Sequence, residues 1–412
     1  MNYELDCDRH PAFAPSLRPA GSTDEFGDIF AELDQAVREH SSSSHKTLQY
    51  IERIEKKFEE ALNSDGFVLQ DVKPYLIEGM RNGVKRLISE LEERSQLLAK
   101  SNLSSPESQT RAGALYSRGY TLFKMPSSIV ADLTAELMPD IDLLRSKIPD
   151  AKEQLAMNPS GGAGTSLLNE FCRHAGVFET VSTFMGRSYS HAGFAVHISH
   201  PQDRWYHPFD DLKLPIPRTA NMHFDLSFSV PKAMLYLRDV SEEQGPFSLI
   251  PRSTPWENVC AAQAFAREVL YSLKDYSQAV NGWEHALLAN PAVRDVFSSL
   301  PKSLRQYSHF GDVVIDGTAR SQFLLGSEKQ LVGEAGTMPL FSGAHVLHRG
   351  GIVSRGERWA LQIVFEPDQP VSISPPKPVS FFSRHLQKPL HLSNLLSNLP
   401  TTFKRVLDRR AH

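Results

Sequence analysis

A series of short β-type runs separated by turns constrains the fold of this 412-residue chain more than any other feature. The runs begin near Tyr189 and combine aliphatic, aromatic and β-branched residues, with Gly, Pro or Ser near their ends. In sequence order they are GFAVHISH, KAMLYLRDV, FSLIPRS, TMPLFSG and RWALQIVF. Runs bounded by turn residues are typical of strands. Their number and spacing predict a sandwich or barrel.

Helical periodicity lies mainly ahead of these runs. Apolar residues recur at helical spacing from His45 to about Leu62 and from Val72 to about Lys100. We expect two amphipathic helices there, whose glutamates and lysines form a solvated face, with a dimerisation element as the alternative. Further along we expect an apolar segment, GYTLFKMP, a helix over about Ser127 to Lys147 and, after a Gly-rich break, a second helix. The predicted fold class is a mainly β core with flanking helices, α+β overall.

The length allows one large domain with appendages, or two domains. A polar stretch from Asn102 to Ser108 contains Pro106 and is a candidate boundary. We predict an irregular and helical extension over residues 1–108, a strand-rich domain over 109–370 and a C-terminal extension over 371–412. That last extension has seven basic side chains and one acidic, a formal charge of +6. It is compatible with a solvated tail or with docking to an anionic lipid, a glycan phosphate or a partner surface.

Composition excludes several classes of protein. Hydrophobic residues make up 41% and charged residues 22%, the balance of a folded globular chain. Three cysteines without paired spacing argue against a disulfide framework and against a cysteine-built zinc site, and favour a reducing compartment. A net charge of -4 gives no global reason to expect nucleic acid. Without a basic and apolar leader or a run of about 18 apolar residues, we expect a cytoplasmic protein with no transmembrane segment.

The strongest local motif is the segment NMHFDLSFS, in which His223 and Asp225 are two residues apart. On a strand both side chains would leave the same face, so one imidazole and one carboxylate could bind one ion. Among the 16 histidines, His223 alone is followed two positions later by an acidic residue. A chain with so many histidines has about one such pair by chance, so the motif depends on its context.

The context comes from a distant segment, FSGAHVLHRGGIVSRGERWALQIVF. Iron(II) oxygenases with two histidines and one carboxylate take three ligands on one face of the metal and leave three positions for co-substrate and oxygen. The third ligand would be a histidine on a facing strand, and this segment offers His345 and His348. An arginine then opens the next β-type run. A bidentate guanidinium is suited to the far carboxylate of a dicarboxylate co-substrate.

This order of motifs resembles the phytanoyl-CoA dioxygenase family within the 2-oxoglutarate-dependent oxygenases. The first matching stretch is MHFDLSFSVPKAMLYLRDVSEEQGPFSLIPRS, which is similar to the family's HxD, strand, acidic turn ending in Asn/Gln-Gly-Pro, and Ile-Pro-Gly-Ser-like turn. The second is GEAGTMPLFSGAHVLHRGGIVSRGERWALQIVF, similar to the segment with the distal histidine and the arginine. Together with GYTLFKMP, the resemblance covers about Ala112 to Pro367. It implies a double-stranded β-helix, or jelly roll, as the catalytic core.

The resemblance implies that His223 and Asp225 are proximal iron ligands and that His348 is the distal ligand. We prefer His348 to His345 because it precedes a Gly-containing turn at residues 349–351, as in the family, and because it lies ten residues before Arg358. The alternative role for His345 is that of a supporting or core histidine.

Arg358 is the implied anchor for 2-oxoglutarate. It begins a strand on which every second side chain shares its face, whereas the rival, Arg355, sits in the preceding turn. On the strand after the HxD motif, Lys232, Met234 and Tyr236 share one face. Lys232 and Tyr236 are therefore candidates to line the co-substrate pocket, with a role in the barrel wall as the alternative.

The implied activity is that of an Fe(II)- and 2-oxoglutarate-dependent dioxygenase, which uses O2 to hydroxylate an unactivated C–H bond and releases succinate and CO2. Asp225 favours hydroxylation, since halogenating relatives have a small residue in its place. Residues 251–254 read PRST where the family commonly has Gly-Ser-His, which leaves the substrate's shape open. Two other classes remain: a cupin-like metal-binding protein without oxygen chemistry, and an inactive jelly-roll interaction protein.

The stretch HISHPQDRWYHPFDDLKLP, just ahead of the HxD motif, is polar and aromatic. It predicts either an ordinary solvated loop or a loop at the mouth of the active site, where Arg204 and the nearby aromatic residues would contact a polar substrate. The expected partner is a small-molecule substrate, for which lipid- and carbohydrate-linked molecules are candidates, and no nucleic acid.

Overall fold

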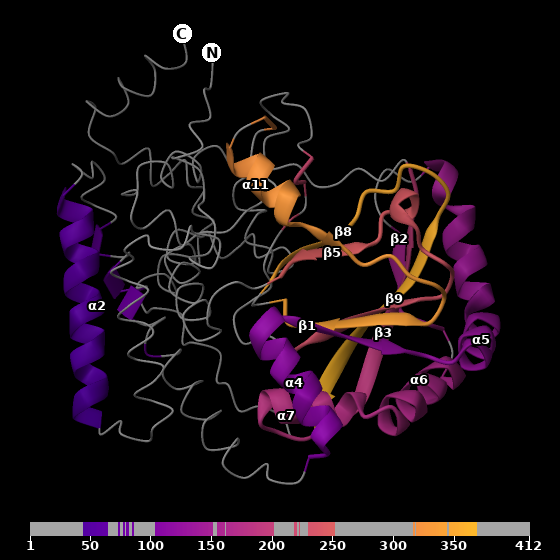
Figure 1. The fold of residues 1–412 in the computed structure, drawn as a ribbon, viewed down its shortest axis with the longest axis horizontal. Helices are drawn as coiled ribbons and strands as arrows, with labels where there is room; N and C mark the ends of the chain where they lie inside the picture. Colours follow the sequence, from indigo (N-terminus) through magenta and orange to yellow (C-terminus); the bar gives the residue numbers. More distant parts are fainter. Residues whose placement is uncertain are drawn as a thin grey trace, which may run out of the picture.

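Figure 1 shows the fold in a computed structural model of the chain. The structure describes residues 44–64, 104–150, 155–160, 162–201, 218–220, 222, 230–251, 316–317, 319–343 and 346–368, with short helical pieces between 73 and 85. Within these residues, no helix is long and apolar enough to cross a bilayer.

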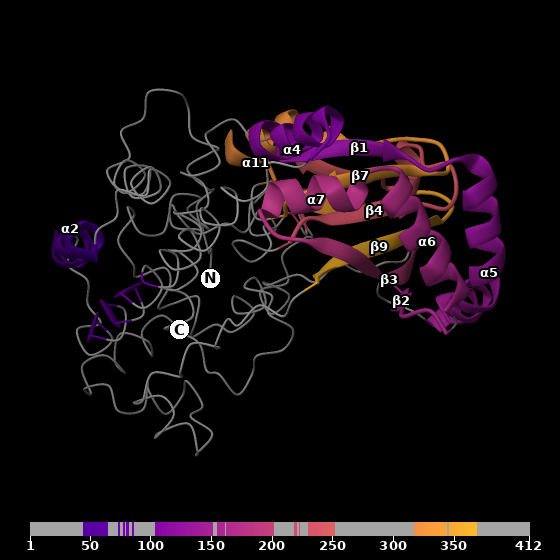
Figure 2. The same ribbon diagram turned by 90° about the horizontal axis from the view of Figure 1, so that it is seen from below.

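The larger of two antiparallel sheets has six strands in the order β1-β7-β4-β9-β3-β2, which Figure 2 shows from top to bottom. Its strands are β1 (Tyr120–Lys124), β2 (Leu155–Met157), β3 (Tyr189–Ser199), β4 (Lys232–Tyr236), β7 (Thr337–Phe341) and β9 (Arg358–Pro367). The two longest, β3 and β9, lie side by side, and Ser199 of β3 is opposite Arg358 of β9. The first residue of β9 is therefore anchored well inside the sheet.

The smaller sheet has three strands in the order β6-β5-β8. They are β5 (Phe247–Ile250), β6 (Lys329–Gln330) and β8 (Leu347–Gly350). On β8, His348 is opposite Leu249 of β5. A capping-box turn, η4 (Glu242–Gln244), leads into β5, and α11 (Ala319–Ser327) leads into β6.

Helices cover one face of the six-stranded sheet, as Figure 2 shows for α6 and α7. They are α4 (Pro106–Arg118), α5 (Ser127–Ser146), α6 (Ala163–His174) and α7 (Val177–Met185), with the short η2 (Ile148–Asp150) after α5. The start of α4 follows from its sequence. The side chain of Ser105 accepts a hydrogen bond from the Ser108 N–H, and Pro106 occupies the first turn, where it costs no hydrogen bond.

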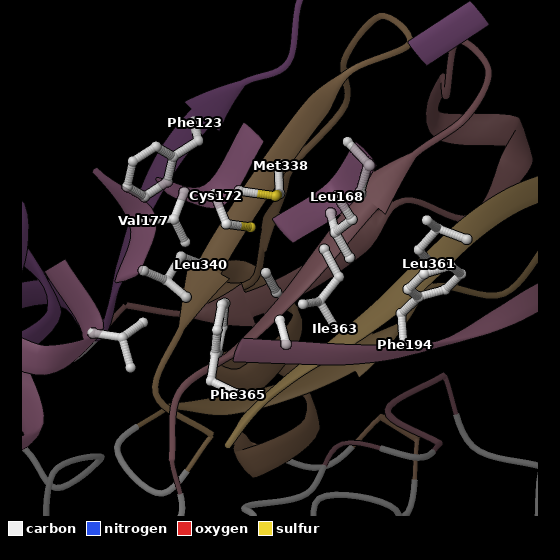
Figure 3. Packing of buried hydrophobic residues seen from close by; sticks show 14 of the residues in the cluster. Phe123, Leu168, Cys172, Val177, Phe194, Met338, Leu340, Leu361, Ile363 and Phe365 are labelled. Carbon is white, nitrogen blue, oxygen red and sulfur yellow. The ribbon is translucent and has the colours of Figure 1, made fainter. Parts of the chain in front are cut away.

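The main core lies between these helices and the sheet (Figure 3). Alternate residues of β9 enter it, among them Leu361, Ile363 and Phe365, because successive side chains of a strand point to opposite faces. They pack with side chains such as Phe194 of β3 and Leu168 of α6. The helices therefore seal one face of the sheet and leave the other for function.

A second cluster lies on the opposite face, between the two sheets. It includes Met234 and Tyr236 of β4, Ala360 of β9, Phe341 of β7 and Phe247 of β5. We call this face of the six-stranded sheet the inner face. On β9 it carries Arg358, Ala360 and Gln362, whereas the residues between them enter the main core.

Several predictions are confirmed. Helix α5 covers the predicted range, α2 (Ser44–Ser64) covers the first predicted amphipathic helix, and every quoted β-type run contains a strand. GYTLFKMP forms β1. The result is α+β with antiparallel sheets, and the described strands do not close into one barrel, so the double-stranded β-helix remains a prediction.

Three boundaries differ from expectation. Arg349 and Gly350 belong to strand β8, so the predicted turn after His348 starts later, at Gly351. Of the predicted polar loop, residues 197–199 belong to β3, because ten residue pairs with β9 hold the strand to its end. Helix α4 begins inside the boundary segment, at Pro106. The helical part of the second amphipathic segment is described only in pieces up to residue 85, and the basic tail lies outside the described residues.

Candidate active site

His348 lies on β8, is 5% exposed and contacts the cluster between the sheets. Its ring centroid is 4.8 Å from that of Phe341 and 5.9 Å from that of Phe247. Its Nδ1 atom is 3.0 Å from the carbonyl oxygen of Val346. A carbonyl oxygen can only accept a hydrogen bond, so Nδ1 carries the proton in this arrangement and the lone pair is on Nε2.

This chemistry fits a metal ligand. Histidines that bind metals usually donate their other ring N–H to a carboxylate or a backbone carbonyl, which fixes the tautomer and the orientation of the ring. Imidazole and carboxylate are donors that suit non-haem Fe(II). The predicted partners His223 and Asp225, and the rival His345, lie outside the described residues. Within the described part of the chain, no three His, Cys, Asp or Glu side chains are grouped to hold a metal ion.

Arg358 is 2% exposed at the first position of β9. Its Nη1 atom donates to the carbonyl oxygens of Gly245 and Gly351, the second at 3.2 Å, and its Nη2 atom donates to the Ser199 hydroxyl at 2.8 Å. Gly351 is three residues after His348. The guanidinium therefore joins the start of β9 to the end of the strand that carries the predicted distal ligand.

Gly245, from the Gln-Gly-Pro turn, and Gly351, from the turn after β8, meet at the Arg358 guanidinium. Gly245 has φ +63°, and a Cβ atom there would lie 2.4 Å from the carbonyl oxygen of Gly351. A Cβ atom on Gly351 would lie 2.5 Å from the carbonyl oxygen of Pro246. These distances are too short for any side chain, so both positions need glycine. The N–H of Gly351 donates to Pro246 at 3.0 Å, which closes the joint between β5 and β8.

The rival arginine lies at the surface. Arg355 has a side chain that is 79% exposed and a guanidinium Nε atom 3.7 Å from the carboxylate of Glu243. Its turn is attached through the N–H groups of Ser354 and Arg355, which both donate to the Glu243 carbonyl, at 2.8 and 3.1 Å. Arg358 is interior and Arg355 is exposed, as expected for a strand residue and a turn residue.

Lys232 and Tyr236 lie on the inner face at the two ends of β4. Lys232 is partly buried opposite Val364, whereas Tyr236 is fully buried. The Tyr236 hydroxyl donates to the Leu331 carbonyl at 2.8 Å and accepts from the Phe247 N–H at 2.9 Å. Burial raises the pKa of Tyr236 to about 12, although the charge of Arg358 acts in the opposite direction. The hydroxyl is thus neutral and joins the two sheets.

His197 is a partly buried inner-face residue of β3 that sits next to the predicted anchor. Burial and then the positive charge of Arg358 lower the pKa of His197 to about 4, while a hydrogen bond with Gln362 opposes the shift. The imidazole is therefore neutral near pH 7. A neutral imidazole beside a guanidinium leaves the positive charge of Arg358 uncompensated by that neighbour.

Arg349 points away from His348 and forms a buried ion pair with Glu328. Its Nε and Nη2 atoms each lie 2.8 Å from a different carboxylate oxygen, and the two side chains are 7% and 6% exposed. Its Nη1 atom donates to the carbonyl oxygens of Arg218 at 2.6 Å and Ala220 at 3.0 Å. The Ser248 hydroxyl of β5 donates to the same carboxylate.

Sequence reasoning did not identify Arg349 or Glu328 as parts of the candidate site, and it considered His197 and Ser199 only as members of a polar loop at the mouth of the site. The ion-paired residues are 21 positions apart, and the carbonyls that Arg349 binds are about 130 residues away in the sequence. No local pattern predicts such partners. One signal in the sequence could have indicated a buried partner for Arg349. This arginine follows a candidate ligand within an apolar β-type stretch, where a buried cation without a counter-ion would be costly.

No family model matches the chain, and no curated protein matches it. Among solved structures, the 2-oxoglutarate-dependent epimerase SnoN from nogalamycin biosynthesis is 12% identical with a TM-score of 0.32, and the match covers 65% of this chain and 87% of SnoN. A Pseudomonas putida prolyl-4-hydroxylase is 11% identical with a TM-score of 0.31, over 64% of this chain and all of that one.

A third structure is EctD from S. alaskensis with 2-oxoglutarate and 5-hydroxyectoine, at 13% identity and a TM-score of 0.34, over 63% of this chain and 75% of EctD. The resemblance to the phytanoyl-CoA dioxygenase family remains a prediction from the sequence motifs, and the function proposed below rests on residues of this chain.

Proposed function

We propose that this chain is an Fe(II)- and 2-oxoglutarate-dependent dioxygenase that hydroxylates an unactivated C–H bond of a small molecule. In this proposal His223, Asp225 and His348 hold the iron, and Arg358 binds the far carboxylate of 2-oxoglutarate. Lys232 and Tyr236 line the co-substrate pocket. Iron and 2-oxoglutarate, when bound, supply the oxidation by O2 that releases succinate and CO2.

The observation that carries the proposal is the bond from Arg358 to the carbonyl of Gly351, three residues beyond His348. This bond attaches the buried guanidinium at the start of β9 to the residue that follows β8. Strand β8 carries the buried imidazole of His348, which has its lone pair on Nε2. A chelating dicarboxylate needs a metal ligand and a carboxylate anchor on neighbouring segments of the chain.

The approach of the other two ligands is supported by chain length. The carbonyl of Ala220 is 3.0 Å from Arg349, the neighbour of His348. His223 follows three residues later, and three residues span at most about 11 Å. Asp225 lies two residues further on. This short distance along the chain supports the proposed role of the HxD motif beside β8.

The remaining inner-face residues have supporting tasks. Tyr236 holds β5 to β4 through its hydroxyl, and its side chain belongs to the cluster between the two sheets. Neutral His197 places no negative charge beside Arg358, so it does not oppose the binding of a dianionic co-substrate. The buried aromatic rings of Phe341 and Phe247 exclude water from His348, which strengthens electrostatic contacts inside the site. A lipid- or carbohydrate-linked substrate remains a proposal from the sequence alone.

The first experiment separates this enzyme from a cupin-like or inactive protein. Purified protein is titrated with 2-oxoglutarate under anaerobic conditions in the presence of Fe(II), and the charge-transfer absorbance of the chelate is recorded. Succinate is then measured after addition of O2 and ascorbate. We expect chelation in the wild type and none in Asp225→Ala. Failure of the wild type to bind 2-oxoglutarate with Fe(II) would remove the proposal.

A second experiment distinguishes the two arginines. Arg358→Lys keeps the charge but loses the fork, whereas Arg355→Lys makes the same change at an exposed position. We expect the concentration of 2-oxoglutarate needed for half-saturation to rise at least about tenfold in Arg358→Lys and to change less than about twofold in Arg355→Lys. Near-UV circular dichroism checks the fold, since Arg358 also holds Gly245 and Gly351. The reverse ranking would assign the anchor to Arg355.

A further inference from the structure

Four donors of the Arg349 guanidinium have named acceptors, and none of them is on β8 itself. Two go to Glu328, at the junction of α11 and β6, and two go to the carbonyl oxygens of Arg218 and Ala220. The Ser248 hydroxyl adds β5 through Glu328. One buried ion pair thus ties three separate pieces of the chain to the strand of His348.

Stability alone gives a weak reason for this arrangement. Removing two charges from water is expensive, and apolar residues of similar volume often stabilise a core better than a buried ion pair does. An ion pair that also orients backbone groups does something that apolar residues cannot, because it fixes direction as well as distance. Residues 218–220 form a turn without a strand partner, so their position depends on such contacts.

The turn is held from both sides. The Arg218 N–H donates to a carboxylate oxygen of Asp316 at 2.9 Å, and its carbonyl accepts from Arg349 at 2.6 Å. The Met222 N–H donates to the Thr219 carbonyl at 3.1 Å, which closes the turn. Thr219, Ala220 and Met222 are buried. His223 is the next residue in the sequence.

We propose that the Arg349–Glu328 ion pair positions the turn that contains residues 218–220 and Met222 against β8 and thereby sets the affinity of the site for its metal. The inference rests on the proposed function, because it assigns the turn to the delivery of His223 and Asp225. Arg349 and Glu328 are positioning residues and bind no metal themselves. Arg349 needs its planar fork for this task, since a lysine ammonium cannot hold both carboxylate oxygens and both carbonyls in one geometry.

Two variants and one control test the proposal on the full chain. Arg349→Lys keeps the charge and removes the fork, and Glu328→Gln removes the charge that compensates Arg349. The control is Glu334→Gln, because Glu334 forms an ion pair with Lys124 at 3.2 Å but its side chain is 84% exposed. Thermal midpoints establish that each variant is folded. Arg349→Lys keeps the test decisive if Glu328→Gln fails to fold.

Two readouts are taken. The first is the dissociation constant of Mn(II), measured by electron paramagnetic resonance without co-substrate or turnover. We expect it to rise about 10- to 100-fold in Arg349→Lys and to stay within about twofold in Glu334→Gln. The second is hydrogen exchange of peptides that cover residues 218–222, which does not depend on metal. We expect faster exchange there in Arg349→Lys and in Glu328→Gln, but not in Glu334→Gln.

The outcomes separate the inference from the proposed function. Unchanged exchange at residues 218–222 would overturn the positioning role, and faster exchange with unchanged Mn(II) affinity would show a contact that serves the fold alone. If the wild-type protein binds no Mn(II), the proposed function fails, and with it the claim about metal affinity, whatever the exchange data show. Faster exchange together with weaker Mn(II) binding supports the inference.

Discussion

The Tyr236 hydroxyl provides a sharp test of how the two sheets are joined. It donates to the Leu331 carbonyl at 2.8 Å and accepts from the Phe247 N–H at 2.9 Å. All three residues are 5% exposed or less. Tyr236→Phe keeps the ring and removes the hydroxyl, so that a buried N–H and a buried carbonyl each lose a partner.

The expected loss follows from those two orphaned groups. A buried donor or acceptor without a partner costs about 1–3 kcal/mol, and the phenylalanine regains a little because no hydroxyl is desolvated. We expect Tyr236→Phe to lower the free energy of unfolding by about 2–4 kcal/mol. That is a large part of the ~5–15 kcal/mol typical of folded proteins.

The assay is urea unfolding followed by tryptophan fluorescence, with the free energy obtained by linear extrapolation. The matched control is Tyr120→Phe in the same cluster, since Tyr120 is 4% exposed and its hydroxyl makes no hydrogen bond among the described residues. The control should change stability by less than about 0.5 kcal/mol. Equal effects of the two variants would show that the hydroxyl does not join the sheets.

Three further predictions concern ionisation. Burial lowers the pKa of His197 to about 4, so as the pH falls the unfolded chain protonates this histidine before the folded chain does. The stabilisation from neutral His197, at most about 3 kcal/mol, is therefore lost as the pH falls from about 6.5 towards 4. His197→Gln should flatten that part of a curve of unfolding free energy against pH. Hydrogen bonds from the Ser105 N–H and from the hydroxyls of Ser105 and Ser108 lower the pKa of Glu179. The Glu179 carboxylate therefore stabilises the folded chain above the usual glutamate pKa, and this stabilisation is lost at lower pH. An acid-unfolding curve of Glu179→Gln identical to that of the wild type would contradict this. Burial raises the pKa of the Cys172 thiol to about 12, so iodoacetamide should label the Cys172 peptide slowly in the native protein and quickly in urea, as peptide mass spectrometry would show.

Local sequence was sufficient for much of the fold. The period-two pattern of RWALQIVF predicted a strand starting at Arg358 with alternate residues on one face, and β9 has both properties. The apolar spacing of residues 127–147 predicted α5. These predictions succeed because a side chain's direction in a helix or strand depends on its neighbours in the sequence.

The candidate site was predictable to a smaller extent. His348 and Arg358 were predicted from the family resemblance with the help of their spacing, and the structure shows that both are buried and that Arg358 contacts the segment just after His348. A strand was expected to carry the third ligand, but the bounds of β8 were not predicted, because the four residues LHRG are too few to show a strand pattern. Its place depends on pairing with β5, about 100 residues earlier in the sequence.

The sequence alone therefore determined which residue types are available for the proposed iron and 2-oxoglutarate site and in which order they occur. The tertiary structure decided what those residues contact: Arg358 holds two glycine carbonyls, Tyr236 joins two sheets, and Arg349 with Glu328 fixes a turn ahead of His223. The reason is physical. A buried polar group must find a partner somewhere, but which partner it finds depends on chain segments that only folding brings together.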